Sequence, residues 1–377
     1  MPGAMHGCAV RSSPAGWALA ALAAASLASA APPDRLGPAA PADDHAAAGA
    51  AAGPVAEQVY SNLQVLRGVP AEQILPAMEL ISASLGVSCE HCHVAPAFES
   101  DDKPAKATAR EMMRMVRALE RDEFEGRRAV TCWSCHRGAL RPATEPAPAP
   151  GDEGPPAPPA AEPVGPELEE APGVSAAEVL ARHLEAVGGA EAARAVTGRV
   201  ARGTATLYGG RELPVEIRQR APGRYSMVLE LAGGELVSAL DGPAGVVEAP
   251  GRPPRPMNGA EVAVARLAND FEWVARPEEV LAAPRVAGRR TLDGREAVVV
   301  EARIEGHPVE LSFDLEDGLL HRVLAWVETP FGRLATRVDL GEYREIDGLL
   351  TPVSWTVARP QGAFTVHLTD FGEGSAS

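Results

Sequence analysis

The sequence predicts a multidomain α+β protein with a small helical segment, a proline-rich linker and a strongly curved antiparallel sheet with helices against one face. Three sequence patterns and the chain length support this prediction. Apolar residues recur at helical spacing within residues 55–142, and a Pro/Ala/Glu tract occupies residues 143–172. Short alternating apolar runs separated by Asp-Gly dipeptides fill residues 173–377. A chain of 377 residues is long enough for two folded domains.

The N-terminus is predicted to be an export signal. Residues 1–30 contain an apolar run from 15 to 28, which ends in an A-x-A cleavage motif and is too short to span a bilayer. Cleavage there removes Cys8 and leaves four cysteines. Residues 31–54 are rich in Ala and Pro, so we expect a disordered leader. We therefore expect the mature protein in the periplasm, either soluble or peripheral to the membrane.

The first helix of residues 55–142 is predicted over residues 70–85. Pro70 suits its first turn, Gly86 suits its end, and Pro76 should bend it. Its apolar face contains Ile74, Met78, Ile81 and Leu85.

The second helix is predicted over residues 103–121, with Asp101 and Asp102 as its N-terminal cap. Its apolar stripe contains Ala109, Met112, Val116 and Leu119. An opposite basic stripe contains Arg110, Arg114, Arg117 and Arg121. The simplest interpretation of the basic stripe is a solvated helix face.

Each helix is followed by a C-x-x-C-H pentapeptide, CEHCH at 89–93 and CWSCH at 132–136. This spacing is typical of covalent c-type haem attachment, because two thiols on one turn reach the two vinyl groups of one porphyrin. The histidine that follows then reaches the iron as its proximal ligand. The sequence therefore predicts two covalently bound c-type haems, attached through Cys89, Cys92, Cys132 and Cys135 and ligated by His93 and His136. Structural zinc or a redox disulfide is the alternative.

Methionines supply candidates for the sixth iron ligand. Four of the eight methionines, Met78, Met112, Met113 and Met115, lie on the two predicted helices. A methionine on an apolar helix face is usually core filler, but this concentration beside both motifs favours ligation. We predict Met78 for the first haem and Met112 for the second, with Met115 as the alternative to Met112; Met113 points elsewhere on its helix.

The other polar groups near the motifs receive simpler interpretations. His91 should point away from its own haem and lie at the surface, with ligation of the other iron as the alternative. Some arginines of the basic stripe could instead pair with haem propionates or dock an acidic partner. The remaining histidines considered are interpreted as surface or packing residues: His183, His307, His321 and His367.

The region after the linker is predicted to be mainly antiparallel sheet. The linker, 143–172, should be semi-rigid and extended. Ser175 and Glu178 form a capping box for a helix that runs to Gly188-Gly189, and a second helix is expected at about 260–273. Hairpin turns are predicted at Asp241-Gly242, Asp293-Gly294, Glu305-Gly306, Asp317-Gly318 and Asp347-Gly348.

Residues 57–142 resemble the cytochrome c subunit family of photosynthetic reaction centres. The likeness lies in NLQVLRGVPAEQILPAMELISASLGVSCEHCHV, FESDDKPAKATAREMMRMVRALE and VTCWSCHRG. In that family a helix precedes each C-x-x-C-H, and a helix methionine ligates most of the haems. Met78 and Met112 match those methionines, which favours Met112 over Met115. The family carries four haem motifs and this chain has two, and the distant histidine of the family's bis-His haem has no clear match. The resemblance thus implies haem geometry and electron transfer, in the family's case photosynthetic electron transport.

The C-terminal region resembles the periplasmic lipoprotein-carrier type of half-barrel. The likeness lies in LARHLEAVGGAEAARAVTGRVARGTA and FDLEDGLLHRVLAWVETPFGRLATRVDLGEYREIDGLLTPVSWTV. It implies an antiparallel β half-barrel around a helix, with an apolar cavity. The expected occupant is a lipid, a quinone-like molecule or a protein partner.

Together these features predict a periplasmic dihaem c-type cytochrome that carries electrons and is not an enzyme. The partner is expected to be a redox protein, soluble or membrane-bound. A net charge of −16 argues against nucleic acid. A peroxidase-like dihaem enzyme is one alternative, although a methionine beside each haem argues against an open iron. A haem-based sensor or binding module is the other.

Overall fold

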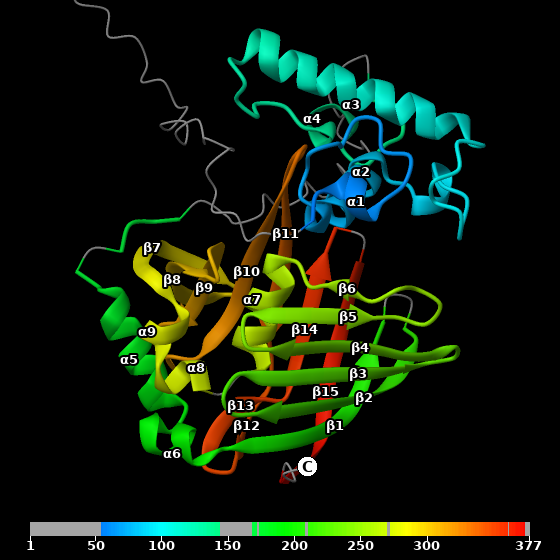
Figure 1. Ribbon diagram of the computed structural model, residues 1–377. Helices are drawn as coiled ribbons and strands as arrows, with labels where there is room; N and C mark the ends of the chain where they lie inside the picture. Colours follow the sequence, from blue (N-terminus) through cyan, green and yellow to red (C-terminus); the bar gives the residue numbers. More distant parts are fainter. Residues whose placement is uncertain are drawn as a thin grey trace, which may run out of the picture. The chain divides into compact units, whose positions relative to one another are not determined.

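The computed structural model describes residues 54–143, 168–171, 173–207, 210–269, 272–360 and 362–373. The predicted signal peptide, nearly all of the predicted leader and most of the predicted linker lie outside these residues. The described part contains a helical segment and an extensive antiparallel sheet with helices, so the predicted α+β class is confirmed (Figure 1).

The helical segment consists of short and long helices joined by loops. The elements are α1 Ala56–Val59, the 3₁₀ turn η1 Ala71–Gln73, α2 Ile74–Leu85, the 3₁₀ turn η2 Cys89–His91, α3 Pro104–Glu123 and α4 Cys132–His136. Helix α2 ends as predicted at Gly86, whose φ of 66° is left-handed and therefore favours glycine. Pro76 falls in the first turn of α2, where an amide has no partner within the helix in any case.

Helix α3 differs from the prediction in its cap and its buried face. Its N-cap is Lys103, followed by Pro104, and no side chain caps it, so the predicted aspartate cap is wrong. Of the predicted apolar stripe only Val116 is buried. The buried face contains Lys106, Met113, Val116 and Glu120. Two apolar stripes overlap on this helix, and the packing partners select the one that is buried.

The sequence predicted that the basic stripe of α3 is a solvated face, but this holds for only part of the stripe. Arg110 donates to the Asn62 carbonyl at 3.1 Å, and Arg117 donates to the Val65 carbonyl at 2.8 Å. Arg114 is exposed. Two arginines of the stripe therefore tie α3 to the loop between α1 and η1.

Thirteen strands form one antiparallel sheet in the order β6-β5-β4-β3-β2-β1-β15-β14-β11-β10-β9-β8-β7, and β12 and β13 form a separate hairpin. The strands are β1 Gly198–Thr206, β2 Glu212–Arg220, β3 Arg224–Leu231, β4 Gly234–Asp241, β5 Ala244–Glu248, β6 Arg255–Pro256, β7 Ala282–Leu292, β8 Arg295–Ile304, β9 His307–Asp314, β10 Leu320–Thr329, β11 Gly332–Leu340, β12 Tyr343–Ile346, β13 Leu349–Pro352, β14 Ser354–Arg359 and β15 Gly362–Glu373. In Figure 1 the green strands β1 to β5 lie next to one another, and the red strands β15 and β14 follow on the side of β1.

The predicted hairpin turns are present. Asp293-Gly294, Glu305-Gly306 and Asp347-Gly348 each connect two neighbouring strands as two-residue turns, with both residues at positive φ between 48° and 82°. This is the type I′ geometry that suits the right-handed twist of paired strands.

Helices lie against the sheet. They are α5 Ala176–Ala186, α6 Gly189–Ala195, α7 Gly259–Asn269, α8 Glu272–Ala275 and α9 Pro277–Val280. The Ser175 capping box is present: the Ser175 hydroxyl accepts from the Glu178 amide at 3.2 Å, and the Glu178 carboxylate accepts from the Ser175 amide at 2.9 Å. Helix α7 packs on β9, β10 and β11. Its Arg266 donates to the carbonyls of Gly223 and Gly242, in turns at the other half of the sheet. The sheet therefore curves around α7.

The helical segment packs on the hairpin that joins β10 and β11. Phe331, at the turn of this hairpin, has 0% of its surface exposed, and the Arg117 guanidinium lies 5.5 Å from the centre of its ring. Arg128 donates to the Thr329 carbonyl at 2.7 Å and to the Glu328 carboxylate at 2.9 Å. Core residues of α2 and α3 therefore belong to the same apolar cluster as the sheet.

Candidate haem sites

The first motif forms a tight turn with its histidine held by the backbone. Residues Cys89–His91 make the 3₁₀ turn η2, and the His93 amide donates to the Cys89 carbonyl at 3.0 Å. Nδ1 of His93 lies 2.8 Å from the Phe98 carbonyl oxygen. Since a carbonyl only accepts, Nδ1 carries the hydrogen and Nε2 keeps its lone pair for a metal.

The second motif is a five-residue helix with the same histidine arrangement. Helix α4 begins after Thr131, whose hydroxyl and Ser134 form a capping box, and ends at Arg137 in the left-handed region. Nδ1 of His136 lies 3.0 Å from the Ala139 carbonyl oxygen, which again leaves Nε2 available. In both motifs, Nδ1 of the histidine therefore donates to a backbone carbonyl and Nε2 is the nitrogen that could bind a metal.

The cysteines are available for covalent attachment. All four are free thiols; Cys89 and Cys135 are exposed, and Cys92 and Cys132 are partly buried. Burial raises the pKa of the Cys92 and Cys132 thiols. Neither motif forms the predicted alternative of a disulfide.

A tetrahedral zinc site finds no support in this geometry. Its ligand atoms must lie close to one another. Within the described residues, the only group of three Cys, His, Asp or Glu side chains whose ligand atoms lie within 4.8 Å of one another is Asp314, Asp317 and His321. That group is far from the motifs in sequence, and Arg295 pairs with Asp314 and Asp317, both at 2.7 Å.

The surface around the motifs fits an apolar prosthetic group. All eight of the exposed large apolar side chains among the described residues lie between residues 59 and 140. They are Val59, Leu75, Phe98, Met112, Met115, Leu119, Trp133 and Leu140. Of these, Phe98 lies beside the first motif, with its ring centre 5.6 Å from that of His93, and Trp133 is part of the second motif. The residues therefore fit porphyrin rings beside the two C-x-x-C-H turns.

The predicted axial methionines occupy different environments. Met78 is half-buried on α2 against the core. On α3, Met113 is 8% exposed within the core, whereas Met112 and Met115 are 40% and 44% exposed. Met113 is buried, which agrees with the prediction that its side chain points away from those of Met112 and Met115. Those two methionines lie on the exposed apolar stripe of α3.

The second motif is held at both ends by distant parts of the chain. At its C-terminal end, the Gly138 amide donates to the Ser84 carbonyl at 2.9 Å. A Cβ on Gly86 would lie 2.2 Å from the Gly138 oxygen, so this close approach requires glycine. At its N-terminal end, Thr131 packs closely on Gly332: a Cβ added to Gly332 would lie 3.1 Å from the Thr131 methyl group.

The other predicted residues lie outside this constellation. His91 is exposed. His183 is buried, His307 and His321 are partly buried, and His367 is exposed on β15. Sequence reasoning missed Lys106 and Asn62, which bind the loop after the first motif. The sequence did contain a signal for Lys106, because Lys103 and Lys106 are the only lysines among 35 basic residues.

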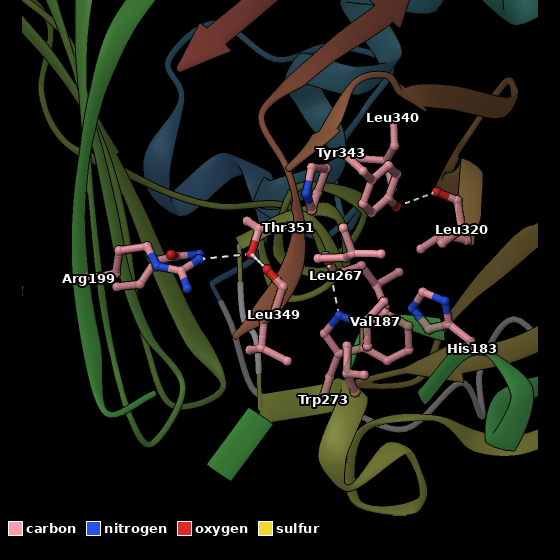
Figure 2. Close-up of a pocket in the computed structure, with 14 residues that line it drawn as sticks. His183, Val187, Arg199, Leu267, Trp273, Leu320, Leu340, Tyr343, Leu349 and Thr351 are labelled. Atoms are coloured by element: carbon pink, nitrogen blue, oxygen red, sulfur yellow. Dashed lines mark hydrogen bonds between the residues drawn. The ribbon is translucent and has the colours of Figure 1, made fainter. Parts of the chain in front are cut away.

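The β region has a small cavity between its helices and strands (Figure 2). Its volume is about 70 Å³, and its lining combines Val187, Leu267 and Trp273 with His183 and Arg199. Arg199 donates to the Thr351 hydroxyl at 3.0 Å and to the Asp347 carboxylate.

Part of this chain is similar in sequence to known cytochromes. Residues 20–155 match the family model of the photosynthetic reaction centre cytochrome C subunit, so the resemblance inferred from the sequence is confirmed. Over 90 residues the chain is 36% identical to the photosynthetic reaction center cytochrome c subunit of Thermochromatium tepidum, which is 23% of this chain and 22% of that protein. Over 85 residues it is 38% identical to cytochrome c-554 of Chloroflexus aurantiacus, which is 21% of this chain and 20% of that protein. The match therefore spans about a fifth of each relative.

The β region also has a partial match among solved structures. A crystal structure of a LolA superfamily protein from Nitrosomonas europaea aligns over 54% of this chain and 96% of its own, at 13% identity and a TM-score of 0.38. This describes a broad similarity and carries no information on a ligand. Among the described helices, none combines the length and apolarity needed to cross a membrane.

Proposed function

We propose that this chain is an exported dihaem c-type cytochrome that transfers electrons between protein partners. The observation that carries the proposal is the repeated geometry of the two C-x-x-C-H turns: free cysteines on one turn, and a histidine whose Nδ1 donates to a backbone carbonyl. The similarity of residues 20–155 to reaction-centre cytochrome c subunits supports the electron-transfer role.

The chain's own residues would bind and orient two haems. Cys89 and Cys92 would hold one through thioether bonds, and Cys132 and Cys135 the other. Nε2 of His93 and of His136 would face the irons, since Nδ1 of each ring is bound to a carbonyl. When bound, each haem supplies a one-electron Fe(III)/Fe(II) couple.

For the sixth positions we propose Met78 and Met112, with Met115 as the alternative to Met112. A thioether ligand raises the reduction potential and closes the site to exogenous ligands, which suits a carrier and not a peroxidase. Helix α3 favours Met112 and Met115 equally by exposure, at 40% and 44%. The match of Met112 to the family's helix methionine favours Met112.

The domain organisation remains part of the proposal: signal peptide 1–30, leader 31–54, dihaem domain 55–142, linker 143–172 and β domain 173–377. We also propose export to the periplasm, because of the predicted signal peptide, and a protein redox partner, soluble or membrane-bound, because an electron carrier needs one. The β domain packs against the dihaem domain through the β10–β11 hairpin. We propose that it supports the dihaem domain, with binding of a hydrophobic ligand as a further role.

The decisive experiment is the amount of covalent haem per polypeptide, measured by intact mass and pyridine haemochrome after export with a cytochrome c maturation system. Two haems per chain are expected. Zero haem with bound zinc would refute the proposal. One haem would refute the dihaem assignment, and Cys89→Ala and Cys132→Ala would identify the motif that is used.

Carbon monoxide binding to the reduced protein separates the carrier from the enzyme. Two methionine-ligated haems should leave the Soret band unchanged on addition of carbon monoxide. A haem that binds carbon monoxide readily has an open iron and would favour the peroxidase alternative. A haem potential that changes when a small ligand fills the β domain would favour the sensor.

A further inference from the structure

Both lysines of this arginine-rich chain lie next to the first haem motif. The chain has 35 basic residues, of which Lys103 and Lys106 are the only lysines. Nζ of Lys103 donates to the carbonyl of Glu90, inside the motif. Lys106 is 8% exposed, on the buried face of α3. A buried cation needs a specific set of partners.

Lys106 has partners that suit an ammonium group. Its Nζ donates to three consecutive carbonyls, those of Phe98 at 3.0 Å, Glu99 at 2.8 Å and Ser100 at 2.8 Å. It also lies 3.2 Å from the Asp101 carboxylate. An ammonium directs three N–H groups from one atom, whereas the planar fork of arginine cannot converge on three carbonyls in this way. This explains a lysine where the chain otherwise uses arginine.

One of these carbonyls also holds the motif histidine. The Phe98 oxygen accepts from Nδ1 of His93 at 2.8 Å and from Nζ of Lys106 at 3.0 Å. The loop that carries it is fixed further by Asn62, whose amide nitrogen donates to the Glu99 carbonyl at 2.6 Å and to the Asp101 carboxylate at 2.9 Å. Lys106 and His93 are therefore linked through one shared acceptor atom, the Phe98 carbonyl oxygen.

We propose that Lys106 is a positioning residue for His93 and raises the potential of the first haem. It fixes the Phe98 carbonyl, and so fixes the plane and tautomer of the His93 ring. A hydrogen bond from Nδ1 makes a ligating histidine more basic. The Lys106 ammonium donates to the same Phe98 oxygen and therefore weakens the hydrogen bond from Nδ1 of His93. Its positive charge also favours the reduced state of the iron. The inference rests on the proposed function, because it assumes iron on Nε2 of His93.

The second motif provides the internal comparison. His136 donates to the Ala139 carbonyl at 3.0 Å, in the turn that follows α4. Lys106 is bound to the carbonyls of residues 98–100. Removing the ammonium should therefore act on the first haem and leave the second nearly unchanged.

The test compares Lys106→Met, Lys106→Arg and the control Arg114→Met in the full-length protein matured with haem. Arg114 is exposed on the same helix, so its replacement removes one positive charge without touching the loop. The potentials are measured by spectroelectrochemical titration, and His93→Met identifies the component that belongs to the first haem. Hydrogen exchange of the Phe98 and Ser100 amides reports the order of the loop.

In Lys106→Met we expect the equilibrium constant for reduction of the first haem to fall about tenfold, a shift of about 59 mV for a one-electron couple. We expect exchange of the loop amides to accelerate, with the second haem and Arg114→Met unchanged. Lys106→Arg should lower the potential less, because it keeps the charge, and should still accelerate loop exchange.

Three results would overturn the inference: an unchanged first potential in Lys106→Met, an equal shift in Arg114→Met, or a Lys106→Arg protein that matches the wild type in both measurements. A wild-type protein without covalent haem would instead refute the proposed function. In that case the loop exchange still tests whether Lys106 orders the residues that hold His93.

Discussion

His183 should make the protein lose stability in mild acid. Its ring is 3% exposed and lies 5.5 Å from the Trp273 ring and 5.1 Å from the Phe313 ring. Nδ1 donates to the Gly318 carbonyl at 3.0 Å. Burial lowers the pKa of His183 from 6.5 to about 4, against the opposing effect of that hydrogen bond.

The sign and size of the effect follow from proton linkage. The unfolded chain takes up a proton on His183 as the pH falls through 6.5, whereas the folded protein resists protonation down to about pH 4. The protein is therefore not destabilised by His183 above pH 6.5, and it loses stability progressively as the pH falls from 6.5 to 4. Each pKa unit corresponds to about 1.4 kcal/mol, so the full loss is about 3 kcal/mol, with about 2 kcal/mol of it already lost at pH 5.

The assay is urea unfolding followed by far-UV circular dichroism at pH 7.5 and pH 5. We compare the wild type with His183→Gln, which keeps a donor for the Gly318 carbonyl but does not titrate, and with the control His367→Gln at an exposed position on β15. The pH-dependent loss should shrink by about 2 kcal/mol in His183→Gln and persist in His367→Gln. Equal losses in all three proteins would refute the reasoning.

Three further predictions concern the helical segment. Met78→His and Met112→His should each lower the potential of one haem, because imidazole replaces a thioether; two unchanged redox titrations would show that the axial assignments are wrong. Phe331→Ala should destabilise the protein by about 3–5 kcal/mol, since the ring is fully buried, as measured by urea unfolding; a loss below about 1 kcal/mol would mean that the hairpin turn does not pack against the helices. Glu120→Gln should raise stability at pH 7 by about 1 kcal/mol, because one buried carboxylate oxygen lacks a hydrogen-bond partner and burial raises the pKa of this carboxyl. That gain should vanish in thermal unfolding below pH 4.5, where the carboxyl is protonated in both states; a gain that persists there would contradict the ionisation argument.

Local patterns were sufficient for the features that depend on neighbouring residues. The C-x-x-C-H spacing places two thiols and a histidine on one turn whatever surrounds them, and η2 and α4 have this form. The Asp-Gly turns and the Ser175 capping box are decided by backbone conformation and by hydrogen bonds within four residues. These features, and with them the fold class and the candidate haem motifs, were predicted from the sequence alone.

Prediction failed on α3 because two apolar stripes share that helix. Periodicity identifies a stripe, but it cannot say which one faces a neighbouring element. The stripe containing Met113 and Val116 is buried against the rest of the fold, while Met112 and Met115 remain exposed. The same limit applies to the aspartate cap, because Asp101 instead binds Asn62, Lys106 and Arg110.

By itself the sequence thus determined the two C-x-x-C-H motifs, the turn on which each one lies and the type of each region, because these depend on contacts within a few residues. Only the tertiary structure decided that the hairpin turn at Phe331 packs beneath α3, and that Lys106 and His93 share the carbonyl of Phe98. The Phe331 contact joins residues more than 200 positions apart, and the shared carbonyl depends on how a loop folds back onto a helix. Neither is encoded in a local pattern, because the free energy that selects them comes from packing and desolvation of the whole fold.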